Sequence, residues 1–200
     1  MFVFSSEEKF GPEHDGWQVY SAKHEYKRIL SNVKERKYRI TNINEKYTFS
    51  PTYPSLFVVP ASFSDEDLRS IGDFRSKSRV PVVVYLHPNG ASLSRSSQPK
   101  VGVKGTRNPK DELLIEILRK STKNPTKYAI IDSRPYANVL GNKYLLGAGH
   151  ENPNYYQNCQ ISFFGIENIH VMKASWNKLY ALIKQFSTDI GDPKKHSFTI

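Results

Sequence analysis

Four short apolar runs, each bounded by polar or turn-forming residues, predict the strands of the core. They cover residues 56–60, 80–86, 128–132 and 159–164. A continuous apolar run of about four to eight residues is typical of a strand that is buried on both faces. The turn-forming sequence 87–90 follows the second run and predicts a return strand over 91–94.

Helical periodicity appears in four further segments, at residues 24–30, 64–74, 111–120 and 168–186. Apolar residues three and four positions apart lie on one face of a helix. Ser64 precedes three acidic residues, which predicts an N-cap and a first turn that complements the helix dipole. In 111–120 the residues predicted to face inward are Leu113, Leu114, Ile117 and Leu118.

The alternation of strands and helices predicts an α/β fold, with a central sheet flanked by helices. We expect the four strands to share one sheet, and helix 168–186 to pack on it or beside it. The side chains expected inside this core include Val82, Val84, Ile130 and Phe163.

Composition supports one packed domain with an anionic partner. The chain has 200 residues, of which 38% are hydrophobic, and a formal net charge of +10. No apolar run approaches the roughly 20 residues needed to span a bilayer. The basic residues are spread over both halves of the chain, so nucleic-acid binding is not favoured over a solvated basic face or an anionic lipid surface.

Cysteine and histidine, which often act as nucleophiles or metal ligands, are few or scattered in this chain. Cys159 is the one cysteine, so an internal disulfide is excluded. It lies in an apolar run, which favours a structural role over a nucleophilic one. The six histidines are scattered without the spacing of a metal site. We therefore expect no metal and no cofactor.

A series of short motifs resembles the first part of the myotubularin-type phosphoinositide phosphatase domain. They occur in the family's order and at nearly its spacing. The most recognisable are Asp15-Gly-Trp17, Thr52-Tyr-Pro54, Phe74-Arg-Ser76, Arg79-Val-Pro81, Arg95-Ser-Ser-Gln-Pro99, Asp132-Ser-Arg-Pro135 and Glu167-Asn-Ile-His-Val-Met172.

This resemblance implies part of a cysteine-phosphatase-like domain, of the protein tyrosine phosphatase superfamily, over residues 10–187. Residues 1–9 and 188–200 are then expected to be flexible ends. The family removes the 3-phosphate of phosphatidylinositol 3-phosphate and 3,5-bisphosphate. Its nucleophile is a cysteine followed six positions later by an arginine, and Cys159 is followed at that distance by Gly165. The resemblance therefore predicts no catalytic residue in this chain, and no phosphatase activity.

The resemblance also implies three residues near the substrate, Asn142, Asn168 and His170. An asparagine side chain can donate to phosphate oxygens and accept from sugar hydroxyls. Each position has a structural alternative. Asn168 can cap the helix that follows it, Asn142 can cap locally on a helix face shared with Asn138, and His170 can be a packed helix histidine. Arg134 is expected to form a structural salt bridge.

Two interpretations remain open at this level. The chain is a fragment of a phosphoinositide phosphatase, or it is a pseudophosphatase module that binds phosphoinositide headgroups on anionic membranes or forms a homo- or heterodimer with a family member. Either predicts a cytoplasmic protein that associates peripherally with endosomal membranes. The charge predicts weak, nonspecific lipid binding that salt at ~0.5 M largely removes.

Overall fold

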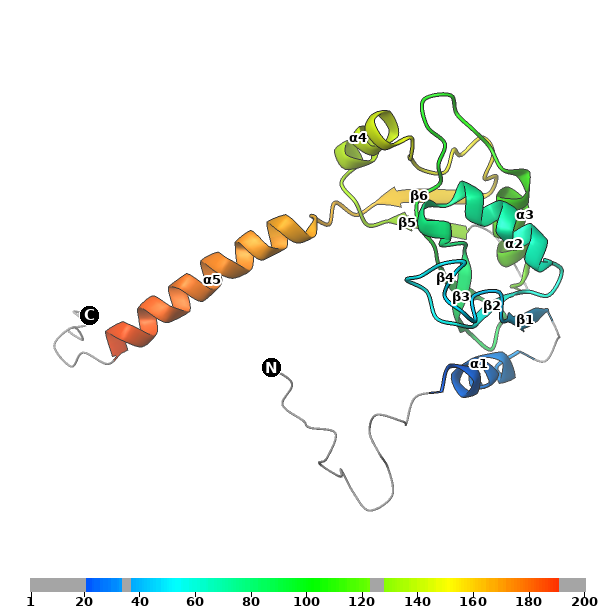
Figure 1. Cartoon of the computed structure of the whole chain (residues 1–200), viewed down its shortest axis with the longest axis horizontal. Coiled ribbons are helices and arrows are strands. Elements are labelled where there is room, and N and C mark those ends of the chain that lie inside the picture. The colour runs from blue at the N-terminus through cyan, green and yellow to red at the C-terminus, as the bar shows by residue number, and fades with distance from the viewer. Residues whose placement is uncertain (1–20, 34–36, 123–127, 191–200) are drawn as a thin grey trace, which may run out of the picture.

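The computed structural model describes residues 21–33, 37–122 and 128–190, with side chains through residue 186. The helices are α1 (Ala22–Ser31), α2 (Asp65–Phe74), α3 (Pro109–Lys120), α4 (Tyr136–Leu146) and α5 (Ile169–Ile190), with a short 3-10 turn η1 (Ser76–Ser78). The strands are β1 (Tyr38–Thr41), β2 (Phe57–Pro60), β3 (Val82–Leu86), β4 (Ser92–Arg95), β5 (Tyr128–Asp132) and β6 (Cys159–Phe163). Figure 1 shows one body from α1 to β6, from which α5 extends away.

The first sheet has four antiparallel strands in the order β1-β2-β3-β4. All four residues of β2 are buried, as the apolar run predicts. The predicted hairpin is confirmed, since β4 pairs with β3 from Val82 opposite Arg95 to Leu86 opposite Ser92. The strand β3 begins after Pro81, which has no N–H to give to a ladder.

The expectation of one sheet for all four predicted strands is wrong. β5 and β6 pair with each other in parallel and form a separate two-stranded sheet. Both edges of β3 are already occupied, by β2 and β4, so no edge of it is left for another strand. Val84 was expected inside and is 40% exposed, next to an irregularity in the β3 register. The broader prediction of an α/β domain with a sheet flanked by helices is confirmed.

The core lies between the first sheet and the helices α2 and α3. Its fully buried members include Leu68 and Ile71 of α2 and Leu114 of α3. The prediction that Leu113 faces inward is wrong, because Leu113 is 52% exposed and Ile115 is buried instead. The buried face of α3 is rotated relative to the predicted one. It includes Asp111, an acidic residue of the first turn, which is fully buried.

Local capping follows the sequence closely. The Ser64 hydroxyl accepts from the N–H of Asp67, whose carboxylate accepts from the N–H of Ser64, which forms a complete capping box at α2. Gly147 ends α4 in the left-handed region, at φ 64°. Glycine adopts this backbone conformation without a steric penalty, which explains why the helix stops there.

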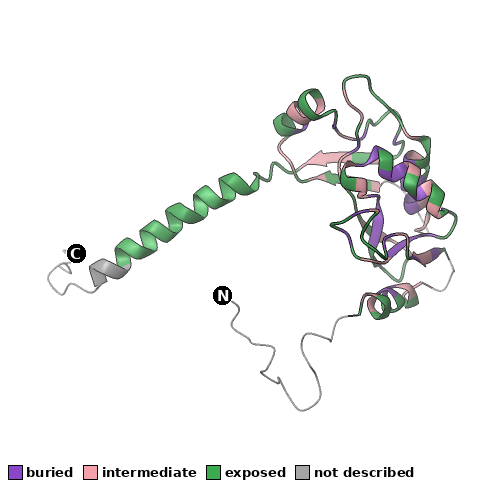
Figure 2. Cartoon of the chain, in the orientation of Figure 1, coloured by how far each residue is buried: buried purple, intermediate pink, exposed green. Residues whose placement is uncertain are grey.

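The position of α5 differs from the prediction that it packs on the sheet. Every residue with a described side chain in this helix is exposed (Figure 2). The reason is that β5 and β6 form a small separate sheet, and the chain leaves it after Phe163 in the direction of solvent (Figure 1). Large apolar side chains of this helix, among them Trp176 and Phe186, are therefore exposed.

Most of the two predicted flexible ends, 1–9 and 191–200, lies outside the described residues. The motif that begins at Asp15 also lies outside them. Residues 188–190 continue the backbone of α5. Among the helices of the described ranges, none combines the length and apolar character needed to cross a membrane.

Candidate functional site

A buried ion network holds the end of α2 against the rest of the body. Arg75 has no exposed surface, and its guanidinium donates to both carboxylate oxygens of Asp111 at 2.8 and 2.6 Å. It also donates to Glu151 at 2.5 Å. The Tyr156 hydroxyl donates to Asp111 at 2.6 Å. Because Asp111 lies on α3 and Glu151 follows α4, one cation joins three parts of the chain.

Electrostatics explains how this arginine is tolerated inside the protein. Burial alone would lower the pKa of Arg75, but attraction from Asp111 and Glu151 outweighs burial and raises it. Burial and the nearby Asp111 raise the pKa of Tyr156, so its hydroxyl keeps its proton and can donate. A paired and fully hydrogen-bonded charge is the form in which an ion is found in an interior.

The loop after Arg75 forms one wall of a cleft. Lys77 and Ser78 have φ values of 57° and 51°, in the left-handed region that residues other than glycine rarely adopt. The Ser50 hydroxyl donates to the Lys77 carbonyl at 3.0 Å, and the Ser97 hydroxyl donates to the Ser76 carbonyl at 2.6 Å. These bonds fix a loop that its own backbone preferences would not select.

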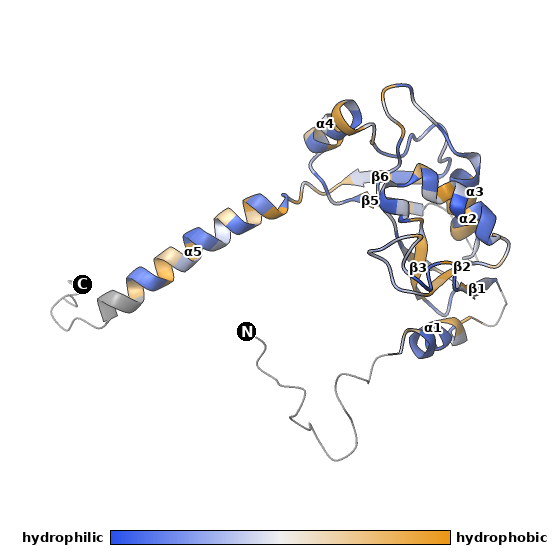
Figure 3. Cartoon of the chain, viewed as in Figure 1, coloured by the Kyte–Doolittle hydropathy of each residue, from blue (hydrophilic) through white to orange (hydrophobic). Residues whose placement is uncertain are grey.

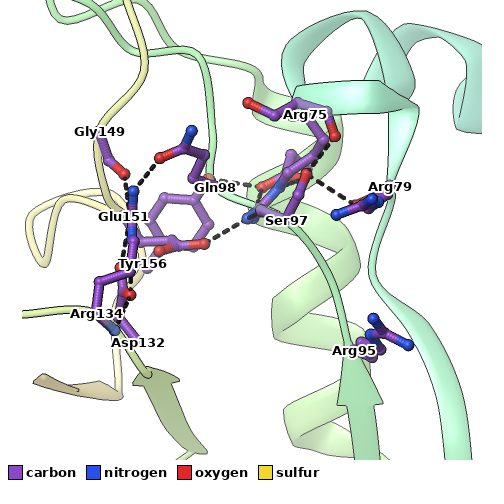
Figure 4. A network of polar contacts seen from close by, with 12 residues as sticks. Arg75, Arg79, Arg95, Ser97, Gln98, Asp132, Arg134, Gly149, Glu151 and Tyr156 are labelled. Carbon is purple, nitrogen blue, oxygen red and sulfur yellow. Dashed lines mark hydrogen bonds and ion pairs between the residues drawn. The ribbon is translucent and has the colours of Figure 1, made fainter. Parts of the chain in front are cut away.

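The opposite wall is built around Arg134, at the carboxyl end of β5 (Figure 4). Its guanidinium forms an ion pair with Asp132 at 2.6 Å, which confirms the expected salt bridge. It also donates to the Gly149 carbonyl at 3.0 Å and to the side-chain carbonyl of Gln98. Burial would raise the pKa of Asp132, but the hydrogen bonds from Arg134 prevail and lower it.

Between the two walls lies an open cleft of about 750 Å³. Its two carboxylates are already engaged, Asp132 by Arg134 and Glu151 by Arg75. Three further cations line it, Lys77, Arg79 and Lys100. Within the described residues none of these three forms an ion pair, although Arg79 donates to the Thr52 hydroxyl at 2.7 Å. The cleft is therefore a concave surface with an excess of positive charge, suited to a polyanionic ligand.

The structure places one of the three predicted substrate residues in this cleft. Asn142, on α4, lines it and donates weakly to Gln98 at 3.5 Å. Asn168 is exposed at the start of α5, where its side-chain oxygen accepts from the N–H groups of His170 and Val171. Its capping alternative is thus confirmed. His170 is an exposed helix residue, so the alternative that it packs in the interior is wrong. Neither Asn168 nor His170 lines the cleft.

Cys159 sits at the start of β6, away from this cleft, and is half buried. Burial, with the nearby Glu116, raises the pKa of its thiol to about 11. A thiol of this pKa is almost wholly protonated at neutral pH, and only the thiolate is a nucleophile. Within the described residues no group of acidic, histidine and cysteine side chains could hold a metal ion.

His150 gives the fold a predicted pH dependence. Its ring packs beside the contacting rings of Tyr136 and Phe163, with centroids 6.1 and 5.5 Å away, and its buried Nδ1 has no hydrogen-bond partner in the described part of the chain. Burial lowers its pKa below the usual value of 6.5. The neutral ring therefore contributes stability above pH 6.5, and this contribution is lost as the pH falls through the lowered pKa.

We expect the free energy of unfolding to decline between pH 7.5 and pH ~5.5, a window that lies above the usual titration of carboxylates. The His150→Phe variant keeps an aromatic ring and removes the titrating group, so its urea midpoint should vary less over the same range. Equal pH dependence in the two proteins would contradict this role of His150.

Sequence reasoning missed the residues that define the cleft. Arg79 and Gln98 stand within recognisable motifs and Lys77 between two of them, but none of the three was assigned a role in binding. A signal was present in the clustering of cations at 75, 77 and 79, but their directions depend on the irregular backbone of η1, which the sequence does not specify. The first enters the interior, and the other two border the cleft.

Comparison with known proteins identifies the family of this chain. The family profile of the myotubularin-like phosphatase domain matches residues 1–198. Myotubularin of Rattus norvegicus is 41% identical over 184 residues, and that of Xenopus laevis 44%. Phosphatidylinositol-3,5-bisphosphate 3-phosphatase MTMR2 of Mus musculus is 41% identical. These matches cover 92% of this chain but only 30%, 30% and 28% of the relatives.

The α/β fold, with a sheet flanked by helices, is thus that of a cysteine-phosphatase-like domain. Within that class, the chain belongs to the myotubularin-like phosphatase family and corresponds to the first part of its domain.

Proposed function

We propose that this chain binds the phosphorylated inositol headgroup of a phosphoinositide in the cleft and does not cleave it. The observation that supports this most strongly is the charge of the cleft. Its carboxylates are paired, whereas Lys77, Arg79 and Lys100 are directed to no acidic partner among the described residues. A phosphate with two negative charges complements such a surface.

The similarity to MTMR2 supports the class of ligand, since that relative is named for its action on phosphatidylinositol 3,5-bisphosphate. The polar groups of Asn142 and Gln98 stand beside the cations and can serve the hydroxyls of an inositol ring. Catalysis requires a nucleophile and stabilisation of the transferring phosphoryl group. The one cysteine of this chain supplies neither, because its thiol is protonated and lies outside the cleft.

The test is a titration of the purified chain with short-chain phosphatidylinositol 3-phosphate below its micelle concentration. Arg79→Ala should weaken binding about fivefold, because a partly screened contact between a cation and a phosphate contributes about 1 kcal/mol. Arg95→Ala is the matched control. It removes the same charge from an exposed arginine that lies outside the cleft, over the Tyr53 ring.

Equal losses in the two variants would show that binding depends only on net charge. Unchanged binding in Arg79→Ala would place the headgroup elsewhere. A large loss in Asn142→Ala that persists at ~0.5 M salt would show instead that the site is selective for the headgroup, and would favour a dedicated binding module over a fragment.

A further inference from the structure

The helix α5 is amphipathic, and no element within residues 21–33, 37–122 and 128–168 covers its apolar side. Its apolar residues Met172, Trp176, Leu179, Ile183 and Phe186 follow one another at spacings of four, three, four and three residues. This spacing places them in one stripe along the helix. Trp176 is 63% exposed and Phe186 65% exposed. Figure 3 shows the apolar positions alternating with polar ones along α5.

The apolar face is broad. Val171 and Leu182 extend the stripe on one side, and Ile169 and Tyr180 extend it on the other, so that it covers about half of the helix circumference at 100° per residue. All four of these side chains are exposed. The apolar stripe by which a helix packs against one other helix in a coiled coil is narrower than this face, because it uses two positions in seven.

The charge of α5 has one sign over residues 168–188, since the sequence contains no acidic residue between Glu167 and Asp189. Lys173 and Lys178 stand at the two borders of the apolar face, and Lys184 lies on the polar side. Two copies of this helix that met along residues 168–188 would bring Lys173 and Lys178 of both copies to the contact, and this stretch supplies no carboxylate to offset their charge.

From these observations we infer that α5 binds in the plane of an anionic membrane, with its apolar face in the acyl chains and its lysines at the phosphate level. A broad apolar face that contains tryptophan and tyrosine, with lysines at its borders, is typical of helices at the bilayer interface. This membrane contact does not depend on headgroup binding in the cleft. It adds an apolar component to the lipid binding expected from charge alone, so part of the binding should persist at ~0.5 M salt.

The experiment uses the full chain carrying Trp17→Phe, so that Trp176 is the one tryptophan. It is mixed with vesicles of phosphatidylcholine, or of phosphatidylcholine with 30% phosphatidylserine, and neither contains a phosphoinositide. We expect a blue shift of the Trp176 emission with the anionic vesicles, and weaker partitioning into the neutral ones. Arg79→Ala should leave this partitioning largely intact, which separates it from headgroup binding.

Leu179→Glu should reduce partitioning tenfold or more, since it removes apolar area and adds charge on the inserted face. Asn177→Glu is the matched control, because it adds the same charge on the polar face and should have a smaller effect. Both positions are exposed, so neither change should alter the urea midpoint.

Three results would overturn the inference. The first is an unshifted Trp176 emission with anionic vesicles, and the second is an equal effect of Leu179→Glu and Asn177→Glu on partitioning. The third is a dimer in sedimentation equilibrium that Leu179→Glu dissociates while vesicle binding stays unchanged, which would show that a second copy covers α5.

Discussion

Replacing Arg75 by methionine should destabilise the protein by about 3–5 kcal/mol, the range measured when one partner of a buried ion pair is removed. The methionine fills much of the volume, but it leaves the carboxylates of Asp111 and Glu151 inside the protein without their cation. For a domain of this size such a loss is a large fraction of the total stability. The measurement is the free energy of unfolding in urea.

Two further variants make this prediction specific. Arg28→Met removes an exposed arginine paired with Glu25 at 2.8 Å, and should change stability by less than about 1 kcal/mol. Tyr156→Phe removes only the hydroxyl that donates to Asp111, and should cost about 1–3 kcal/mol. If Arg75→Met were as mild as Arg28→Met, the buried network would not hold the three parts of the chain together.

The second large effect concerns catalysis. The purified chain should release no phosphate from short-chain phosphatidylinositol 3-phosphate or 3,5-bisphosphate above the rate without protein. With a thiol pKa of about 11, Cys159 is thiolate in about one molecule in ten thousand at pH 7. No arginine follows it at the sixth position, where Gly165 stands. Binding the substrate without favouring the transition state does not accelerate the reaction.

The control is Cys159→Ser, which should give the same background rate as the unchanged chain. An active member of the family, assayed beside it, shows that the substrates are competent. Turnover by the unchanged chain that disappears in Cys159→Ser would make Cys159 the nucleophile and would contradict the proposal.

The parts of the fold that the sequence predicted well depend on local interactions. The capping box at Ser64 needs only residues within one turn, and the buried run of β2 needs only its own apolar character. The hairpin of β3 and β4 is likewise fixed by a short turn between adjacent segments. Short-range patterns of this kind are read directly from residue order.

The errors arise where distant segments meet. Periodicity identified α5 as a helix, but an apolar stripe does not specify what covers it. The division into two sheets depends on which edges of β3 are occupied, which no local pattern contains. The inward face of α3 was misjudged because Asp111 is buried with Arg75, and a charged residue is normally assigned to the surface.

The candidate site was predicted only in part, because it too is formed by segments that are distant in the sequence. Asn142 was identified through the family resemblance, and it does line the cleft. Asn168 and His170 were identified in the same way, yet they lie at the start of α5, outside the cleft. The cations at 77, 79 and 100 come from two segments that are joined by hydrogen bonds of Ser97, Gln98 and Lys100, so their shared role became visible in three dimensions.

The central claim is that the cleft receives a phosphorylated inositol headgroup, and its most direct test is a map of amide chemical shifts. The isotope-labelled chain is titrated with inositol 1,3-bisphosphate, which has no acyl chains and therefore does not engage α5. The account predicts weak, saturable shifts concentrated at 76–79, 96–100 and 132–134, the segments that line the cleft. An absence of shifts at millimolar ligand, or shifts concentrated on another face of the body, would contradict it.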